Sequence, residues 1–64
     1  MHDDWQDAEK RAERAHELFE RGKWEAALEE LRAAITVNPY NGSWHYYLGL
    51  TLDQLQRHEE AIEA

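Results

Sequence analysis

The chain has 64 residues, no cysteine, and a net charge of −7 at pH 7 from fourteen acidic and seven basic side chains. This length allows a single small domain, and without cysteine neither a disulfide nor a thiolate zinc site can stabilise it. The acidic balance disfavours binding to nucleic-acid phosphates, and no basic amphipathic face indicates a membrane surface.

The first predicted helix begins at Asp4, a suitable N-cap, and ends before Gly22, which is typical of a left-handed helix stop. Acidic residues in its first turns are favoured there by the helix dipole. One side carries small and apolar residues at steps of three and four, namely Trp5, Ala8, Ala12, Ala15, Leu18 and Phe19. The other side is charged and includes Arg11, Glu13, Arg14 and Glu17.

A second helix is predicted to begin at Lys23 or Trp24 and to end before Pro39, because proline disfavours helical geometry at Asn38. Its apolar side is Trp24, Ala27, Leu28, Leu31, Ala34 and Ile35. Only two or three residues separate it from the first helix. The two helices are therefore expected to be antiparallel neighbours.

The third predicted helix covers residues 44–56, with Ser43 as its expected N-cap. Apolar side chains cover more than half of its circumference, whereas a surface helix needs only one apolar stripe. We therefore expect packing on both of its flanks. No Asp, Glu, Lys or Arg occurs between Ala33 and Leu52. This uncharged stretch is interpreted as the seam between two helical hairpins, with a partner site in part of it as the alternative.

Residues 57–64 resemble the opening of a fourth helix, with Ala61 and Ile62 expected to face inward. Fewer than two turns remain there, and no stop signal follows, so the chain is expected to end within an element. An isolated helix this short is marginal in water.

A shift of 34 residues superposes small residues on small ones and branched residues on branched ones. It pairs Ala15 with Gly49, Leu18 with Leu52, Ala27 with Ala61, and Leu28 with Ile62. A fixed period in this range is typical of stacked repeats. The chain resembles the tetratricopeptide repeat family in this period, in the 22–27 bend, in the Leu48-Gly49 pair and in the Asn38-Pro39 junction.

This resemblance implies an all-α fold of antiparallel helix-turn-helix units in one domain, residues 1–64, with a first repeat at 8–41 and a partial second repeat at 42–64. Gln56 stands where the first repeat has Gly22, so the third and fourth helices form either a hairpin or one merged helix. Arg11 and Arg14 replace large apolar residues of the family, which suits the polar outer face of a capping repeat.

The resemblance also implies a concave surface lined by the first helix of each repeat, which binds partner peptides or helices. The partner-binding positions are then Ala12, His16, Phe19, Glu20, Tyr46, Leu50 and Asp53, with Glu9 and Ser43 beside them. The family's carboxylate clamp needs Lys and Asn where this chain has Ala12, His16 and Tyr47, so that ligand is rejected. Acidic and aromatic side chains favour a partner with apolar anchors and basic flanks. Alternatively, Tyr46 and Leu50 cover a neighbouring chain.

A rival function is self-assembly. Fewer than two repeats leave a core incomplete, and homodimerisation through the third and fourth helices would cover Leu48, Leu52, Leu55 and Ile62. With Gln56 in the bend, such a dimer could exchange its tails.

No nucleophile or phosphate-loop motif occurs, and the four histidines show no metal-ligand spacing. No enzyme activity, cofactor or metal is therefore expected. The acidic N-terminus lacks the apolar segment of a secretory signal, which favours a cytoplasmic location.

Overall fold

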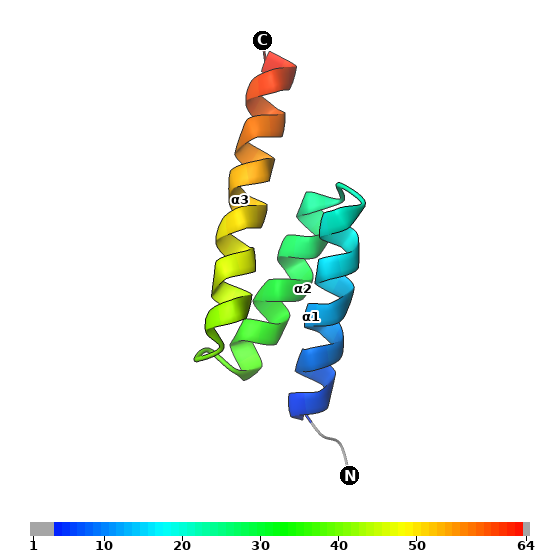
Figure 1. The fold of residues 1–64 in the computed structure, drawn as a ribbon, viewed down its shortest axis with the longest axis vertical. Helices are drawn as coiled ribbons and strands as arrows, with labels where there is room; N and C mark the ends of the chain where they lie inside the picture. The colour runs from blue at the N-terminus through cyan, green and yellow to red at the C-terminus, as the bar shows by residue number, and fades with distance from the viewer. Residues whose placement is uncertain (1–3, 64) are drawn as a thin grey trace.

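A computed structural model describes residues 4–63, which form three α-helices: α1 (Asp4–Glu20), α2 (Trp24–Val37) and α3 (Gly42–Glu63). Figure 1 shows α2 between α1 and α3 and antiparallel to both. The outer helices contact α2 extensively and each other very little. The predicted all-α fold of antiparallel helices is confirmed. None of the helices within 4–63 is long and apolar enough to cross a bilayer.

The turn between α1 and α2 is set by Gly22. This residue has a φ of +77°, in the left-handed region that glycine adopts without a steric penalty. The backbone N–H of Lys23 donates to the carbonyl of Leu18 at 2.9 Å, and that of Gly22 donates to the carbonyl of Phe19 at 3.0 Å. These two bonds form a Schellman motif, so the predicted helix stop is confirmed.

Gly22→Ala is expected to lower the free energy of unfolding by about 1 kcal/mol, because alanine is strained at positive φ. Gly42→Ala is the matched control, since Gly42 is helical and a Cβ there would meet no atom within 4 Å. That control should be neutral or slightly stabilising. Chemical denaturation of both variants measures the difference, and equal losses would contradict the role given to Gly22.

The link between α2 and α3 is built by two asparagines. The backbone N–H of Asn38 still donates to the carbonyl of Ala34 at 3.0 Å, and the helix then ends before Pro39. The side-chain Oδ1 of Asn41 accepts the backbone N–H of Trp44 at 3.2 Å. Asn41 is therefore the N-cap of α3. The predicted cap, Ser43, is wrong, since that residue lies inside the helix.

The core is made mostly of small side chains where α1 and α2 cross. Ala15 is 1% exposed and Ala27 is fully buried, so the two helices approach closely. The buried apolar residues are Ala8, Ala15, Ala27, Leu31, Ala34 and Trp44. Thr51, also fully buried, donates its hydroxyl to the carbonyl of Tyr47 at 2.7 Å, which satisfies its polar group.

The third helix continues to Glu63 without a bend, and its C-terminal part projects beyond the α1–α2 turn (Figure 1). Of the two alternatives left open, the merged helix is the one found. Gln56 supplies no left-handed stop, so helical geometry simply propagates through it. The inward placement of Ala61 and Ile62 is wrong, because both are exposed.

Within residues 4–63, α3 packs mainly against α2 and to a small extent against α1. Trp44 and Thr51 are buried on the packed side. Leu52 remains 44% exposed, as expected for fewer than two repeats, so cover on the second flank stays a prediction. Residues 57–63, predicted to open a fourth helix, are instead part of α3.

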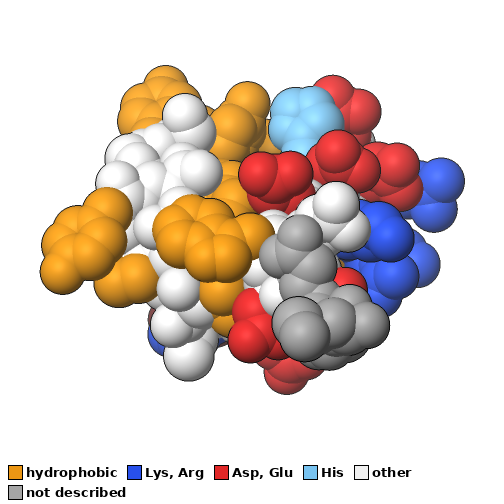
Figure 2. Space-filling model, turned by 90° about the horizontal axis from the view of Figure 1, so that it is seen from below, with side chains coloured by type: hydrophobic (Ala, Val, Ile, Leu, Met, Phe, Trp, Pro, Cys, Tyr) orange, Lys and Arg blue, Asp and Glu red, His pale blue; other side chains and the backbone are white. Residues whose placement is uncertain are grey.

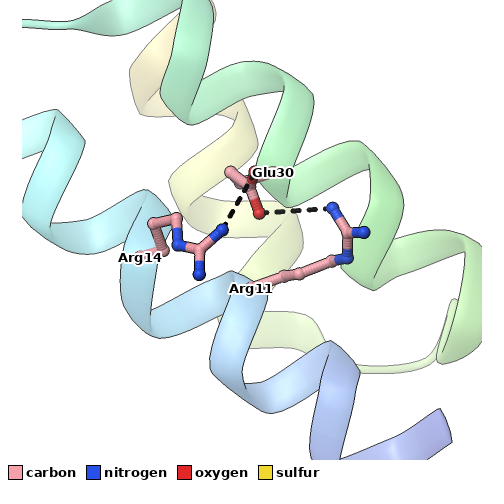
Figure 3. A network of polar contacts seen from close by, with 3 residues as sticks. All are labelled: Arg11, Arg14 and Glu30. Atoms are coloured by element: carbon pink, nitrogen blue, oxygen red, sulfur yellow. Dashed lines mark hydrogen bonds and ion pairs between the residues drawn. The ribbon is translucent and has the colours of Figure 1, made fainter.

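Arg11 and Arg14 do more than provide a polar outer face. As Figure 3 shows, both extend from α1 to the carboxylate of Glu30 on α2, at 3.5 and 3.9 Å. The side chain of Glu30 is only 18% exposed, whereas the two arginine side chains are about half exposed or more. The ion pairs therefore tie the outer edges of the two helices together, although solvent screening limits their contribution.

Candidate functional site

A groove of about 500 Å³ runs between α1 and α3, with Leu31 of α2 at its floor. It exists because the two outer helices barely touch and are separated by α2. Its apolar lining is Ala12, Ala15, Phe19, Leu31, Trp44 and Tyr47. Pockets of about 300–1,000 Å³ hold drug-sized ligands, so the groove can take a few side chains of a peptide.

Aromatic rings join the two walls of this groove. His16 of α1 meets Tyr47 of α3 edge-on, with the ring centroids 5.4 Å apart. Phe19 lies 6.3 Å from Tyr47 and 4.9 Å from Trp24, again edge-on. Edge-to-face pairs at these separations are favourable beyond simple burial. The cluster therefore places aromatic rings between the α1 and α3 walls of the groove.

The rim on the α1 side is acidic, with Glu9, Glu13 and Glu17 in the lining and no lysine or arginine among the lining residues. Figure 2, a view from below, shows acidic side chains gathered next to a histidine and hydrophobic side chains gathered on another part of the same face. His16 contacts Glu20 through Nε2 at 2.9 Å. The rim therefore favours a cationic ligand over an anionic one.

Three of the predicted partner-binding residues line the groove, namely Ala12, His16 and Phe19, as do the neighbouring Glu9 and Ser43. Four others lie outside its lining: Glu20, Tyr46, Leu50 and Asp53. Glu20 pairs with His16, Asp53 pairs with Arg57 at 3.1 Å, Tyr46 is 66% exposed, and Leu50 is half-buried.

Sequence reasoning did not assign Tyr47, Trp44, Glu13 or Glu17 to the groove. Trp44 and Tyr47 belong to the predicted apolar surface of the third helix, and both glutamates belong to the predicted charged side of the first. A one-residue step turns a helix by about 100°, so the choice between Tyr46 and Tyr47 depends on how α3 is rotated against α2. The tight aromatic pairing of Tyr47 with α1 has no signal in the local sequence.

The residues predicted for a self-interface separate into two groups. Leu48 packs against the core, and Leu55 is half-buried beside the α1–α2 turn. Leu52 and Ile62 are exposed, at 44% and 71%.

A second surface is the stripe of exposed residues on α3 that we call the open face, comprising His45, Gly49, Leu52 and Gln56. They follow one another at steps of four, three and four, and so lie on one side of the helix. Gly49 has no atom within 4 Å of where a Cβ would stand.

The described histidines have separate roles. Nε2 of His45 donates to the carbonyl of Pro39 at 2.7 Å and so fastens α3 to the preceding turn. His16 belongs to the groove, and His58 is exposed beside Leu55. Within residues 4–63 no three His, Asp or Glu side chains are grouped as metal ligands. His2 lies outside the described residues.

A family model described as tetratricopeptide repeat matches residues 12–64. Searches of curated proteins and of solved structures found no match.

Proposed function

The chain belongs to the tetratricopeptide repeat family, and from this membership we propose that it is a non-catalytic protein–protein interaction module that holds a partner segment in the groove between α1 and α3. The observation that supports this most is the groove's composition, an apolar and aromatic floor beneath an acidic rim. A cytoplasmic location stays a prediction from the sequence.

The chemistry of the groove defines the partner segment. Ala12, Phe19 and Tyr47, which are only partly buried, offer apolar surface for leucine or aromatic anchors. Carboxylates on the α1 wall favour lysine or arginine beside those anchors, chiefly by steering association and fixing orientation. The partner is therefore a peptide or helix with apolar anchors and basic flanks.

Glu17→Lys is expected to weaken binding of a synthetic peptide with two leucine anchors between lysines by about three- to tenfold, because it reverses a charge on the rim. Glu29→Lys is the matched control, since Glu29 is exposed on α2 and does not line the groove. Tryptophan fluorescence titration measures both affinities, because Trp44 lies in the groove wall.

The loss in Glu17→Lys should shrink as salt is added, since exposed charges are screened. Equal affinities for the two variants, or no saturable change with the unmodified chain, would count against the groove as the binding site.

Self-association is the second candidate function. It is favoured by the exposure of Leu52 along a helix whose other flank is packed. A second chain placed on that flank would complete the cover that a family member normally obtains from its next helix.

A further inference from the structure

We propose that two copies of the chain pair through the open face of α3, antiparallel and related by a two-fold axis, so that Leu52 of each copy lies over Gly49 of the other. This arrangement rests on the proposed role as an interaction module and names the second copy as one of its partners. It leaves the groove free, because the open face and the groove lining share no residue.

The first support is the repeat relationship between α1 and α3. Gly49 occupies the position that Ala15 holds in the first repeat. Ala15 is 1% exposed in the seam with α2, where a small side chain permits close helix packing. Gly49 has the same small size but faces open space. Within residues 4–63, no other helix lies against this position, although its small size suits close helix approach.

The second support is that the face is self-complementary. Gly49 and Leu52 are three residues apart and lie on the same side of α3. In an antiparallel two-fold pair each leucine can enter the hollow left by the other copy's glycine. An interface of this kind uses the same patch on both subunits and closes on itself as a dimer.

The third support is the distribution of charge along α3. Its last turns carry Glu59, Glu60 and Glu63, while its first turn has no acidic residue. The helix dipole makes the first turn electropositive, so carboxylates are favoured beside it. An antiparallel pair places the acidic end of each helix near the first turn of the other, whereas a parallel pair would bring the acidic ends together.

A dimer that exchanges the C-terminal parts of α3 would not cover the open face. Because α3 is straight, Ala61 and Ile62 lie about 120° and 140° around the helix from Gly49. A single neighbouring helix cannot contact both sides at once. The side-by-side pair avoids this conflict and uses only the open face.

Sedimentation equilibrium of the unmodified chain across a wide concentration range is expected to fit a monomer–dimer equilibrium. Leu52→Gln and Gly49→Gln should each raise the dimer dissociation constant at least about tenfold. Gly49→Gln should also raise the thermal midpoint of the monomer, because glycine is a poor helix former. Ile62→Gln is the matched control, being an exposed apolar residue of α3 off the open face, and should leave the constant unchanged.

Orientation is tested with two single-cysteine variants, His45→Cys and Gln56→Cys, in a chain that has no other cysteine. In the antiparallel pair His45 faces Gln56 of the other copy, while the two His45 positions are about 16 Å apart along the helix. Oxidising a mixture of the variants should give the mixed disulfide dimer. Far-UV circular dichroism checks that each variant remains helical.

Homodisulfides as the main product, a monomer at all concentrations, or equal weakening by Ile62→Gln would each overturn the pairing. Peptide titration of Gly49→Gln separates this result from the groove proposal. That variant should bind the lysine-flanked peptide as the unmodified chain does, whether or not the dimer forms.

Discussion

Leu31→Ala is expected to unfold most of the chain. Leu31 is 2% exposed, lies in the middle helix, and forms the floor of the groove. Among the buried apolar residues of 4–63, only Leu31 and Trp44 are larger than alanine. Leucine-to-alanine changes in a core cost about 2–5 kcal/mol. A domain below about 70–80 residues rarely has more than roughly 3–5 kcal/mol in total.

Far-UV circular dichroism with urea measures the effect, and the expected result is a large loss of helicity before any urea is added. Leu52→Ala is the matched control, because it is the same leucine-to-alanine change at a site that is 44% exposed. It should cost less than about 1 kcal/mol when measured on the dilute monomer. If both variants unfolded at the same urea concentration, Leu31 would not be the centre of the core.

The parts of the fold that the sequence predicted are those fixed by local chemistry. Gly22 ends α1 because its left-handed conformation allows the two Schellman hydrogen bonds. The second helix, α2, ends at Val37, because Pro39 disfavours helical geometry at Asn38. The 34-residue period predicted which residues of α1 and α2 are small and buried, and Ala15 and Ala27 confirm it.

The parts that could not be predicted depend on competition between neighbours or on tertiary packing. Asn41 and Ser43 are both acceptable caps, and the asparagine is the one whose side chain reaches Trp44. Gln56 neither stops nor requires a helix, so the sequence allowed both a hairpin and a merged helix. The structure has the merged helix, α3.

The lining of the groove shows the same limit. The family resemblance placed Tyr46 and Leu50 on the concave surface, but the rotation of α3 on α2 brings Tyr47 to His16 instead. That rotation is set by the burial of Trp44 and Thr51. These two residues lie about 160° and 140° around the helix from Tyr46. Periodicity identifies an apolar side, and only packing shows which edge of it faces α1.

Trp44→Ala is expected to detach α3 from the rest of the chain and to abolish peptide binding. Trp44 is 9% exposed and packs in the core at the start of α3, where it also lines the groove. Because α3 contacts α2 far more than it contacts α1, which it meets through the ring of Tyr47, α3 is held chiefly by α2. Removing a buried tryptophan costs about 3–5 kcal/mol, which is as much as the whole chain is expected to have.

Trp44→Phe is the matched control, since it keeps an aromatic ring at the same place and should retain most of the helicity and of the peptide affinity. Thermal melts and titration with the lysine-flanked peptide are measured on both variants, with the fluorescence of the two remaining tryptophans, Trp5 and Trp24, as the common reporter. Both lie in the α1–α2 hairpin, where Trp24 contacts Phe19, and both remain in the two variants. If Trp44→Ala melted like the unmodified chain and lost only peptide binding, Trp44 would be a ligand contact alone, and the attachment of α3 would have to come from Tyr47 and Leu48.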